Sequence, residues 1–326
     1  FFATNVFNVA TEGLEFRMGP IRAEPDPESE IWAPWGALTD VPSKMTGPAR
    51  VERGARLLLR AEVILPMLRD LVMFRHARDA SEQDVKFLPR YPQFEATLDI
   101  HQKVLSGRRG GLIWHHQGSG KTELMAFAAA RILRDPKVVE RFKSPPTVIV
   151  IVDRKDLVRQ TAEMFETAGM PRLLVPSTKR ELWKVLKRDE PAVVITTVHK
   201  FADAGHLNDR ENIIVLVDEA HRSQEGKFGK AWRAAVPKAR FFGATGTAID
   251  DGNRSTFDLF GDPDDPDLVM SRYTPEQSMA DGFTKPIVVE GRSVGFDLDK
   301  AQLDEAFDEL AKDEDLNEDE KAFLSG

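Results

Sequence analysis

The chain has 326 residues, of which 41% are hydrophobic and 30% are charged, and it has no cysteine. This composition is typical of a globular protein, and the length is sufficient for two domains. The lack of cysteine excludes disulfides and thiolate-bound metals, and it is compatible with a reducing cytoplasm. No apolar run approaches the roughly 20 residues that a membrane helix needs. We therefore expect a soluble, cytoplasmic protein without a membrane partner.

The net charge of −8 comes from one segment near the carboxyl terminus. Twelve acidic residues and two lysines lie between Asp297 and Glu320, and the remaining sequence holds 43 basic and 41 acidic residues. A nearly neutral body is compatible with a nucleic-acid partner, because such partners bind to local basic grooves rather than to the mean charge.

Residues 1–35 are predicted to form short strands. Leu14, Phe16 and Met18 recur with the period of two that a half-buried strand requires. So short a segment is unable to enclose a core of its own. We interpret it as the carboxyl-terminal tail of a preceding domain.

Residues 36–88 are predicted to form a helical linker. Apolar residues recur there at steps of three and four, as they do on one face of a helix. Pro66 is expected to kink or split this stretch, because proline lacks an amide donor.

Residues 89–270 alternate between strand and helix patterns, which predicts an α/β domain with a mainly parallel sheet. The expected strands are short and almost continuously apolar, as in strands that are buried on both faces. They are Gly111–His115, Thr147–Asp153, Ala192–Val198, Ile213–Val217 and Ala239–Gly243.

Residues 271–326 are predicted to begin another domain. Tyr273–Gly282 has a helical pattern, and Pro286–Gly291 has the pattern of a strand. The acidic segment that follows is expected to form an exposed helix or an insertion.

The strongest motif reads Gln-Gly-Ser-Gly-Lys-Thr and lies between the first expected strand and a helix pattern. This context predicts a phosphate-binding loop, in which backbone amides and a helix N-terminus bind an anion. Lys121 is expected to reach the β- and γ-phosphates of ATP, and Thr122 to bind Mg²⁺. The stricter pattern has glycine where this chain has His115. The residues assigned to the nucleotide are Gly118, Ser119, Gly120, Lys121 and Thr122.

An Asp-Glu-Ala-His box follows the expected strand Ile213–Val217. Carboxylates at the end of such a strand lie where α/β sheets bind their ligands. Asp218 is expected to hold the Mg²⁺ shell, and Glu219 to orient and deprotonate the attacking water. For His221 two interpretations are open, which are coupling to the next motif and a hydrogen bond in the interior.

Two further features flank these motifs. Thr245 and Thr247 follow the last expected strand, and their hydroxyls are candidates for coupling the Asp-Glu-Ala-His box to bound nucleic acid. Gln93 lies upstream of the phosphate-binding loop, with Tyr91 and Phe94 beside it. Its amide is able to pair with the edge of adenine, and an aromatic ring is able to stack on the base.

Candidate DNA-binding residues follow two other strands. Arg154 and Gln160 come after the second expected strand, and Thr197 and Lys200 come at the end of the third. Loops and helix N-termini at strand ends are common phosphate contacts.

The histidines at 115–116 have no cysteine or third ligand near them, so we interpret them as packing of the phosphate-binding loop.

Together these motifs resemble the restriction (R) subunit of type I restriction–modification enzymes, a superfamily 2 helicase-like translocase. The segments that carry the resemblance are 113–122, 217–224, Gly246-Thr247 and 273–282. The amino-terminal segment with Trp32 and Trp35 is similar to the end of the nuclease domain in that family. Ala248 is a departure, since the family usually has proline there.

The resemblance implies a RecA-like P-loop NTPase domain of three layers at 89–270. It also implies a nuclease-domain tail at 1–35 and the start of a second RecA-like domain at 271–326. Its cofactors would be ATP and Mg²⁺, and its partners double-stranded DNA and the methyltransferase and specificity subunits. Neither the nuclease residues nor the arginine fingers of the family have a match here, so we expect slow ATP hydrolysis by this chain.

Two other interpretations are open at this point. In the first, the chain is part of another superfamily 2 DNA helicase or of a type III restriction subunit, and strand displacement from a forked duplex would favour a helicase. In the second, it is an ATP-gated DNA-binding or assembly module. Glu219 argues against the second interpretation, because a binding switch does not need a base that activates water.

Overall fold

The protein is described here from a computed structural model. The residues that the structure describes are 6–20, 32–75, 85–220, 227–248, 250–251 and 254–285. They all belong to one compact unit, Phe1–Lys285. His221, the expected strand Pro286–Gly291 and the acidic segment lie outside the described residues.

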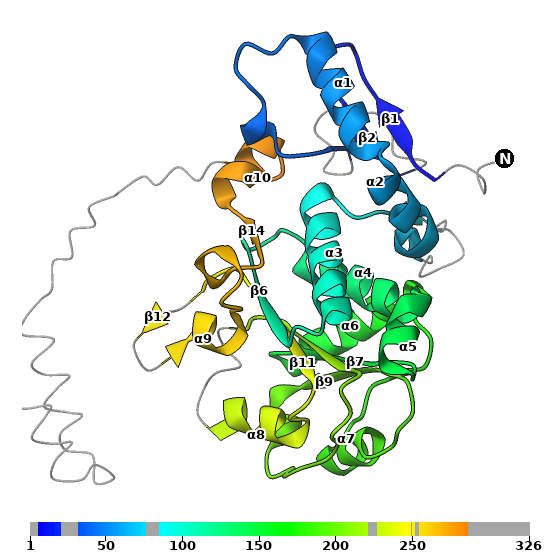
Figure 1. Cartoon of the computed structure of the whole chain (residues 1–326), viewed down its shortest axis with the longest axis vertical. Helices are drawn as coiled ribbons and strands as arrows, with labels where there is room; N and C mark the ends of the chain where they lie inside the picture. Colours follow the sequence, from blue (N-terminus) through cyan, green and yellow to red (C-terminus); the bar gives the residue numbers. More distant parts are fainter. Residues whose placement is uncertain are drawn as a thin grey trace, which may run out of the picture. The chain divides into compact units, whose positions relative to one another are not determined.

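A seven-stranded sheet forms the centre of the fold (Figure 1). Each strand pairs in parallel with its neighbours. In the order in which they lie, the strands are β14 (Ser271–Tyr273), β6 (Gly110–His115), β11 (Arg240–Thr245), β10 (Ile213–Val217), β7 (Thr147–Val152), β9 (Val193–Thr197) and β8 (Leu173–Leu174). The five strands expected from the sequence are all present, and the parallel α/β fold is confirmed.

Helices cover both faces of this sheet, which gives three layers (Figure 1). The first face packs against α3 (Tyr91–Ser106), α4 (Lys121–Arg134), α5 (Pro136–Phe142) and α6 (Lys155–Thr167). The second face packs against α7 (Lys179–Leu186), the short helix η3 (Val198–Phe201), α8 (Lys227–Ala235) and α9 (Thr256–Phe260).

The apolar run in β7 illustrates why the sheet is buried on both sides. Val148, Val150 and Val152 belong to the core under α3 and α4, whereas Ile149 and Ile151 belong to the core on the opposite face. Successive side chains of a strand point to opposite faces, so a continuous run of β-branched residues supplies both cores.

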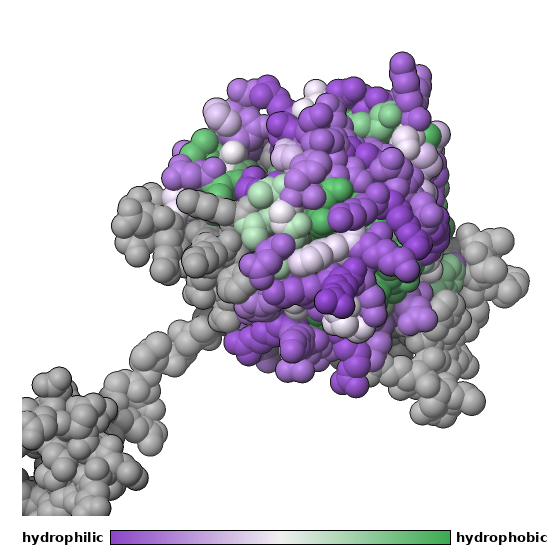
Figure 2. Space-filling view, turned by 90° about the horizontal axis from the view of Figure 1, so that it is seen from below, coloured by the Kyte–Doolittle hydropathy of each residue, from purple (hydrophilic) through white to green (hydrophobic). Residues whose placement is uncertain are grey.

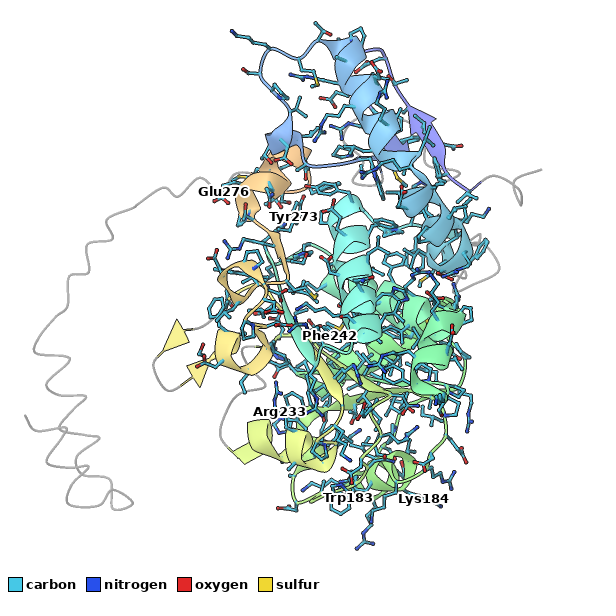
Figure 3. All side chains as sticks on the ribbon, viewed as in Figure 1. Trp183, Lys184, Arg233, Phe242, Tyr273 and Glu276 are labelled. Carbon is cyan, nitrogen blue, oxygen red and sulfur yellow. The ribbon has the colours of Figure 1, made fainter. Side chains whose placement is uncertain are left out.

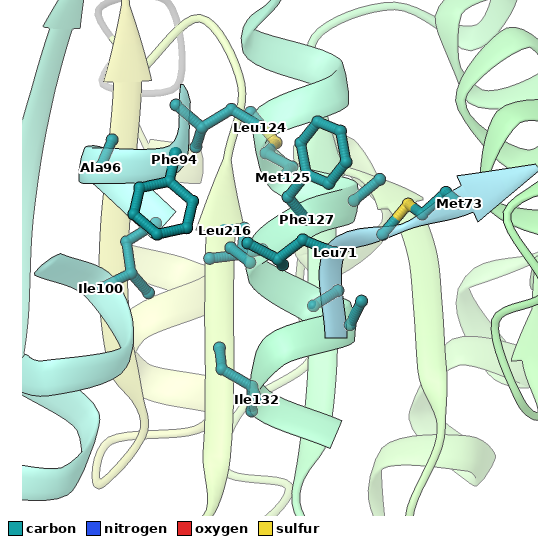
Figure 4. Packing of buried hydrophobic residues seen from close by; sticks show 14 of the residues in the cluster. Leu71, Met73, Phe94, Ala96, Ile100, Leu124, Met125, Phe127, Ile132 and Leu216 are labelled. Atoms are coloured by element: carbon teal, nitrogen blue, oxygen red, sulfur yellow. The ribbon is translucent and has the colours of Figure 1, made fainter. Parts of the chain in front are cut away.

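The core on the first face is centred on α4 and extends to the linker (Figure 4). Phe127 and Ile132 of α4 are fully buried, and Leu71 of the linker is buried in the same cluster. Burial of a large apolar side chain contributes roughly 1.5–3 kcal/mol. The linker is therefore anchored to the sheet domain through its apolar face.

The linker begins with a short helix, η1 (Leu38–Asp40), and continues through α1 (Gly47–Leu58), α2 (Ala61–Pro66) and a π-helical turn, η2 (Met67–Leu71). Two short strands follow, β4 (Met73–Arg75) and β5 (Val85–Phe87). At Pro66, where a kink or split was expected, α2 ends and the chain continues directly into the π-helical turn.

A buried carboxylate also joins the linker to α4. Asp70 is fully buried, and it pairs with Arg131 of α4 and with Arg69. The Arg134 guanidinium donates to the carbonyl oxygen of Asp70 at 2.6 Å. A buried charge is tolerated only when it is paired, so these contacts fix the register of η2 against α4.

The amino-terminal segment forms a small antiparallel sheet of β1 (Asn8–Ala10), β2 (Arg17–Gly19) and β3 (Ala33–Pro34). Phe16 and Trp35 belong to the same buried cluster as α3, and the rings of Trp35 and Phe94 lie 5.4 Å apart. This segment therefore packs against the main core and does not enclose one of its own. The division of the chain at residues 35, 88 and 270 stays a prediction.

The sheet continues past residue 270, because β14 pairs with β6 at its edge. The helix α10 (Pro275–Asp281) follows β14 and is capped by Thr274, whose hydroxyl accepts a hydrogen bond from the Gln277 amide. The structure also contains the small hairpin β12 (Asp250–Asp251) and β13 (Arg254–Ser255), and the short helix η5 (Pro266–Leu268).

Asp281 connects α10 to the linker and to the start of α3. The hydroxyls of Tyr91 and Tyr273 each donate to its carboxylate at 2.8 Å, and the amide of Leu38 donates at 3.0 Å. The carboxylate is fully buried. Burial and the nearby Asp281 charge raise the pKa of both tyrosines, so their hydroxyls stay protonated and donate.

We expect Asp281→Ala to lower the free energy of unfolding by about 3 kcal/mol, because two buried hydroxyls and one part-buried amide would lose their acceptor. Tyr91→Phe removes only one of the donors and is expected to cost about 1 kcal/mol. Urea unfolding of the two variants and the wild type measures both values. An Asp281→Ala variant within about 0.5 kcal/mol of the wild type would contradict this role.

Candidate nucleotide-binding site

The order of the central strands gathers the three main motifs at one edge of the sheet. The strand β11 lies between β6 and β10, and all three run in parallel. The glycine-rich loop follows β6, Thr245 ends β11, and Asp218 follows β10. Ligands of open α/β sheets bind outside the carboxyl ends of the strands, so this edge is the candidate site.

The glycine-rich loop has the backbone that a phosphate-binding loop requires. Gly118 and Gly120 have positive φ angles of 86° and 78°, and α4 begins at Lys121. A side chain at Gly118 would meet no atom within 4 Å, so the space over this residue is open. A Cβ atom at Gly120 would overlap the Gln93 amide nitrogen. The second glycine is thus required by a contact as well as by its backbone angle.

Lys121 and Ser119 are two buried polar side chains of this loop. The Lys121 Nζ atom donates to the carbonyl oxygens of His115 and His116, at 3.5 and 3.3 Å, and the residue is 7% exposed. The Ser119 hydroxyl is buried and has no hydrogen-bond partner among the described residues. Buried polar atoms normally find a partner, so an unpartnered hydroxyl beside a cation fits a bound anion.

The second part of the site is formed by Asp218 and Glu219. Asp218 is 9% exposed and accepts a hydrogen bond of 3.0 Å from the Glu219 amide. Burial and the adjacent Glu219 charge raise the pKa of Asp218 to about 6, and the charge of Lys121 opposes this shift. Lys121 is therefore close enough to act on Asp218 electrostatically. Glu219 has a left-handed φ of 48°, which is uncommon outside glycine and occurs often at functional sites.

Thr245 and Thr247 form a tight hydroxyl turn beside these carboxylates. The Thr245 hydroxyl accepts from the Thr247 amide at 3.1 Å and donates to the Thr247 carbonyl at 3.0 Å. The amide of Ala220 donates to the Ala244 carbonyl at 3.0 Å, which ties the end of β10 to this turn. Thr245 is fully buried, whereas Thr247 is exposed. Thr122 is half-buried in the first turn of α4.

Gln93 contacts the glycine-rich loop directly. Its amide nitrogen donates to the carbonyl oxygens of Gly120 and Ser119, at 3.0 and 3.4 Å, and its amide oxygen accepts from Arg90 at 2.9 Å. These bonds hold the loop against the start of α3. Adenine recognition by Gln93 stays a prediction.

The aromatic residues beside Gln93 are not available to stack on a base. Tyr91 is 4% exposed and bonded to Asp281, and Phe94 is 2% exposed and packs on Trp35. The helical periodicity of α3 directs both rings into the core, which the sequence alone did not indicate.

A pocket of 450 Å³ opens beside Gln93 and the loop. This volume lies in the range of ligand sites for molecules of nucleotide size. Its walls come from the glycine-rich loop, α4, the segment before α3 and the amino-terminal sheet. They include Met18, Ala33, Phe87, Arg90, Gly118, Gly120 and Phe127.

The two histidines of the loop are packing residues in this structure. His115 is 1% exposed, and its Nε2 atom lies 2.9 Å from the Ser271 hydroxyl. Burial and the charge of Lys121 lower the pKa of His115 to about 3, so the ring is neutral. The His116 amide donates to the Tyr273 carbonyl at 3.0 Å. The loop therefore packs against β14, an edge strand that the sequence did not predict.

The residues expected to bind DNA differ in exposure. Arg154 is exposed and lies 3.5 Å from Asp153, and Gln160 is exposed on α6. Thr197 is 1% exposed at the end of β9. The Lys200 ammonium is half-buried and donates to the Pro176 carbonyl. Burial and the charge of Lys155 lower the pKa of Lys200.

Two kinds of feature are absent from the residues that the structure describes. In this part of the chain, no three histidine, cysteine, aspartate or glutamate residues are grouped so as to hold a metal ion. None of the described helices combines the length and the apolar character that crossing a bilayer demands.

Comparison with known proteins identifies the class. The family model of the SWI2/SNF2 ATPases matches residues 92–322. This range is more than half of the chain, which therefore belongs to the SWI2/SNF2 ATPase family. The RecA-like fold that was expected for the sheet domain agrees with membership in this family.

Within that class, the chain is similar to endonuclease subunits of type I restriction enzymes. It is 29% identical over 322 residues to the HindI endonuclease subunit of Haemophilus influenzae, which covers 89% of this chain and 29% of that protein. It is 32% identical over 270 residues to the putative MjaIXP endonuclease subunit of Methanocaldococcus jannaschii, with coverages of 78% and 24%. The chain thus spans less than a third of the length of these relatives.

The resemblance expected from the motifs is confirmed by these relatives, and the chain carries a helicase-like ATPase module. Among solved structures, the SWI2/SNF2 ATPase core of Sulfolobus solfataricus in complex with dsDNA is 16% identical, with a TM-score of 0.40. That likeness covers 52% of this chain and 34% of the other.

Proposed function

We propose that this chain is the ATP-binding part of a motor that moves double-stranded DNA, in the endonuclease subunit of a type I restriction enzyme. The observation that carries the proposal is the meeting of the glycine-rich loop, Asp218 and Thr245 at one edge of the sheet. The family and the relatives support the same conclusion.

In this proposal the loop binds the phosphates of ATP. The amides of Gly118, Ser119 and Gly120 and the N-terminus of α4 present donors to the anion. Lys121 exchanges its two carbonyl contacts for phosphate oxygens, and the Ser119 hydroxyl gains the partner that it lacks. Open space over Gly118 and the unpartnered hydroxyl fit a bound polyphosphate.

The proposed metal ligands are Thr122 and Asp218. Both are oxygen donors of the kind that Mg²⁺ prefers, and Asp218 lies within the electrostatic reach of Lys121. When bound, Mg²⁺ neutralises charge on the phosphates. Asp218 must be ionised to bind the metal, and its pKa of about 6 allows this near neutral pH.

Glu219 is proposed to hold the attacking water and to accept its proton. Its carboxylate follows the ligand Asp218 by one residue, and its left-handed backbone is the type of strained geometry found at functional sites. Thr245 and Thr247 are proposed to transmit the state of this site to DNA, because Ala220 and Ala244 are hydrogen-bonded. A similar role for His221 stays a prediction.

The proposed DNA contacts are Arg154, Gln160, Thr197 and Lys200, and the proposed partners are methyltransferase and specificity subunits.

A triplex-displacement assay tests the motor. The protein, assembled with these subunits, is expected to displace a third strand from duplex DNA only when ATP and Mg²⁺ are present. It is not expected to separate the strands of a forked duplex. Unwinding of the fork would favour a helicase instead, and displacement without ATP would contradict the proposal.

A further inference from the structure

The helix α7 carries a row of basic residues on its outer face. Its inner face is apolar, since Leu182 and Leu186 are 0% and 1% exposed in the core of the second face. Arg180 and Lys184 are four residues apart and share the opposite face of the helix, Lys187 caps its carboxyl end close to the same face, and Arg188 follows directly after the cap. We refer to them as the α7 basic stripe, which consists of Arg180, Lys184, Lys187 and Arg188, all exposed.

The α7 basic stripe is not neutralised by neighbouring acids. Among the residues that the structure describes, its side chains have neither an ion pair nor a hydrogen bond. The nearby acids are occupied elsewhere. Glu181 accepts two bonds of 2.8 Å from Ser177, and Asp189 and Glu190 pair with arginines outside α7. Surface helices commonly neutralise lysines with acids four residues away, so this row leaves a net positive face.

The stripe is held beside a segment that the proposed function already assigns to DNA. The helix α7 packs against η3, and the Trp183 indole donates to the Lys200 carbonyl at 3.1 Å. Lys179 of α7 also lies 3.4 Å from Asp203, just after η3. Because β9 is parallel to the other strands, η3 follows the same edge of the sheet as the nucleotide site.

The surface around α7 matches a charged partner. This helix lies at the lower end of the molecule in Figure 1, and Trp183 and Lys184 are labelled there in Figure 3. Seen from that end, the surface is largely hydrophilic (Figure 2). An apolar partner would leave the four cations of the stripe without counter-charges, whereas a polyanion would supply them.

We propose that the α7 basic stripe binds the sugar-phosphate backbone of duplex DNA, as a contact independent of base sequence. Arg180, Lys184 and Lys187 follow one another at about 6 Å and 4.5 Å along the helix axis. This spacing is comparable to about one to two nucleotides of one strand of a duplex. The inference rests on the proposed function, because it requires that this protein binds double-stranded DNA.

The test is the salt dependence of duplex binding by the full chain, measured by fluorescence anisotropy on a labelled duplex of arbitrary sequence. The variant Arg180→Ala/Lys184→Ala/Lys187→Ala removes three cations from the stripe and keeps good helix formers. Each phosphate contact contributes about 0.9 to the slope of log affinity against log salt. The variant is expected to lose about two to three from this slope, and to bind roughly tenfold or more weakly near 0.1 M salt.

A matched control removes the same charge elsewhere. Lys44→Ala/Lys137→Ala/Lys238→Ala changes three exposed lysines outside α7 and is expected to keep the wild-type slope. The melting temperature and the affinity for ATP are measured as controls for folding. Both are expected to be the same in all three proteins. Equal slopes in the wild type and the stripe variant, or an equal loss in the control, would overturn the inference while leaving duplex binding in place. Failure of the wild type to bind duplex DNA would overturn the proposed function as well.

Discussion

Glu219→Gln is expected to bind ATP as tightly as the wild type and to lose ATP turnover by a factor of about 10³ or more. Glutamine has the size of glutamate and keeps an oxygen that can orient water, but it is unable to accept the proton. Binding is measured by titration with a fluorescent ATP analogue, and turnover by phosphate release. Glu140→Gln, an exposed change on α5, is the matched control and is expected to leave both unchanged.

The separation of binding from turnover is the informative part of this experiment. The Glu219 amide is bonded to Asp218, so a local distortion would weaken binding together with turnover. Equal losses in both measurements would therefore contradict the assignment of Glu219 as the residue that activates water. A turnover within about tenfold of the wild type would contradict it too.

Lys121→Ala is expected to weaken ATP binding by about a hundredfold or more, which corresponds to the roughly 3 kcal/mol of a charge-assisted hydrogen bond. Lys121 is buried at the start of α4, and its ammonium contacts the backbone carbonyls at the beginning of the loop that is expected to bind the phosphates. The fluorescent-analogue titration measures the change. Lys137→Ala removes an exposed lysine after α4 and serves as the control. Wild-type affinity in Lys121→Ala would exclude the glycine-rich loop as the nucleotide site.

Much of the fold follows from local patterns in the sequence. The five central strands were predicted because each contains a short apolar run, which is mostly β-branched in β7 and β10. The edge strands β8 and β14 were not predicted, because they have only two and three residues, too few for a recognisable strand pattern. The membership of β14 depends on its pairing with β6, which lies far away in the sequence. Such pairing is a tertiary effect that a local pattern does not contain.

The candidate site was also predictable in part from local patterns. A loop after one parallel strand and carboxylates after another meet at the same edge, so the proximity of Lys121 and Asp218 followed from the motifs. The contacts that hold the loop and its surroundings in place did not follow from the motifs. Gln93 and Gly120 are 27 residues apart, and Asp281 and Leu38 are 243 residues apart. Each contact joins a polar side chain to a backbone group, and neither partner has a distinctive sequence pattern of its own.

The central claim is that ATP turnover at this site is coupled to duplex DNA. The most direct measurement is the rate of phosphate release with and without linear duplex DNA, in the protein assembled with its partner subunits. We predict that the rate requires Mg²⁺, rises when duplex DNA is added, and is lost in Glu219→Gln under both conditions. A rate that duplex DNA leaves unchanged, or one that persists in Glu219→Gln, would contradict this account.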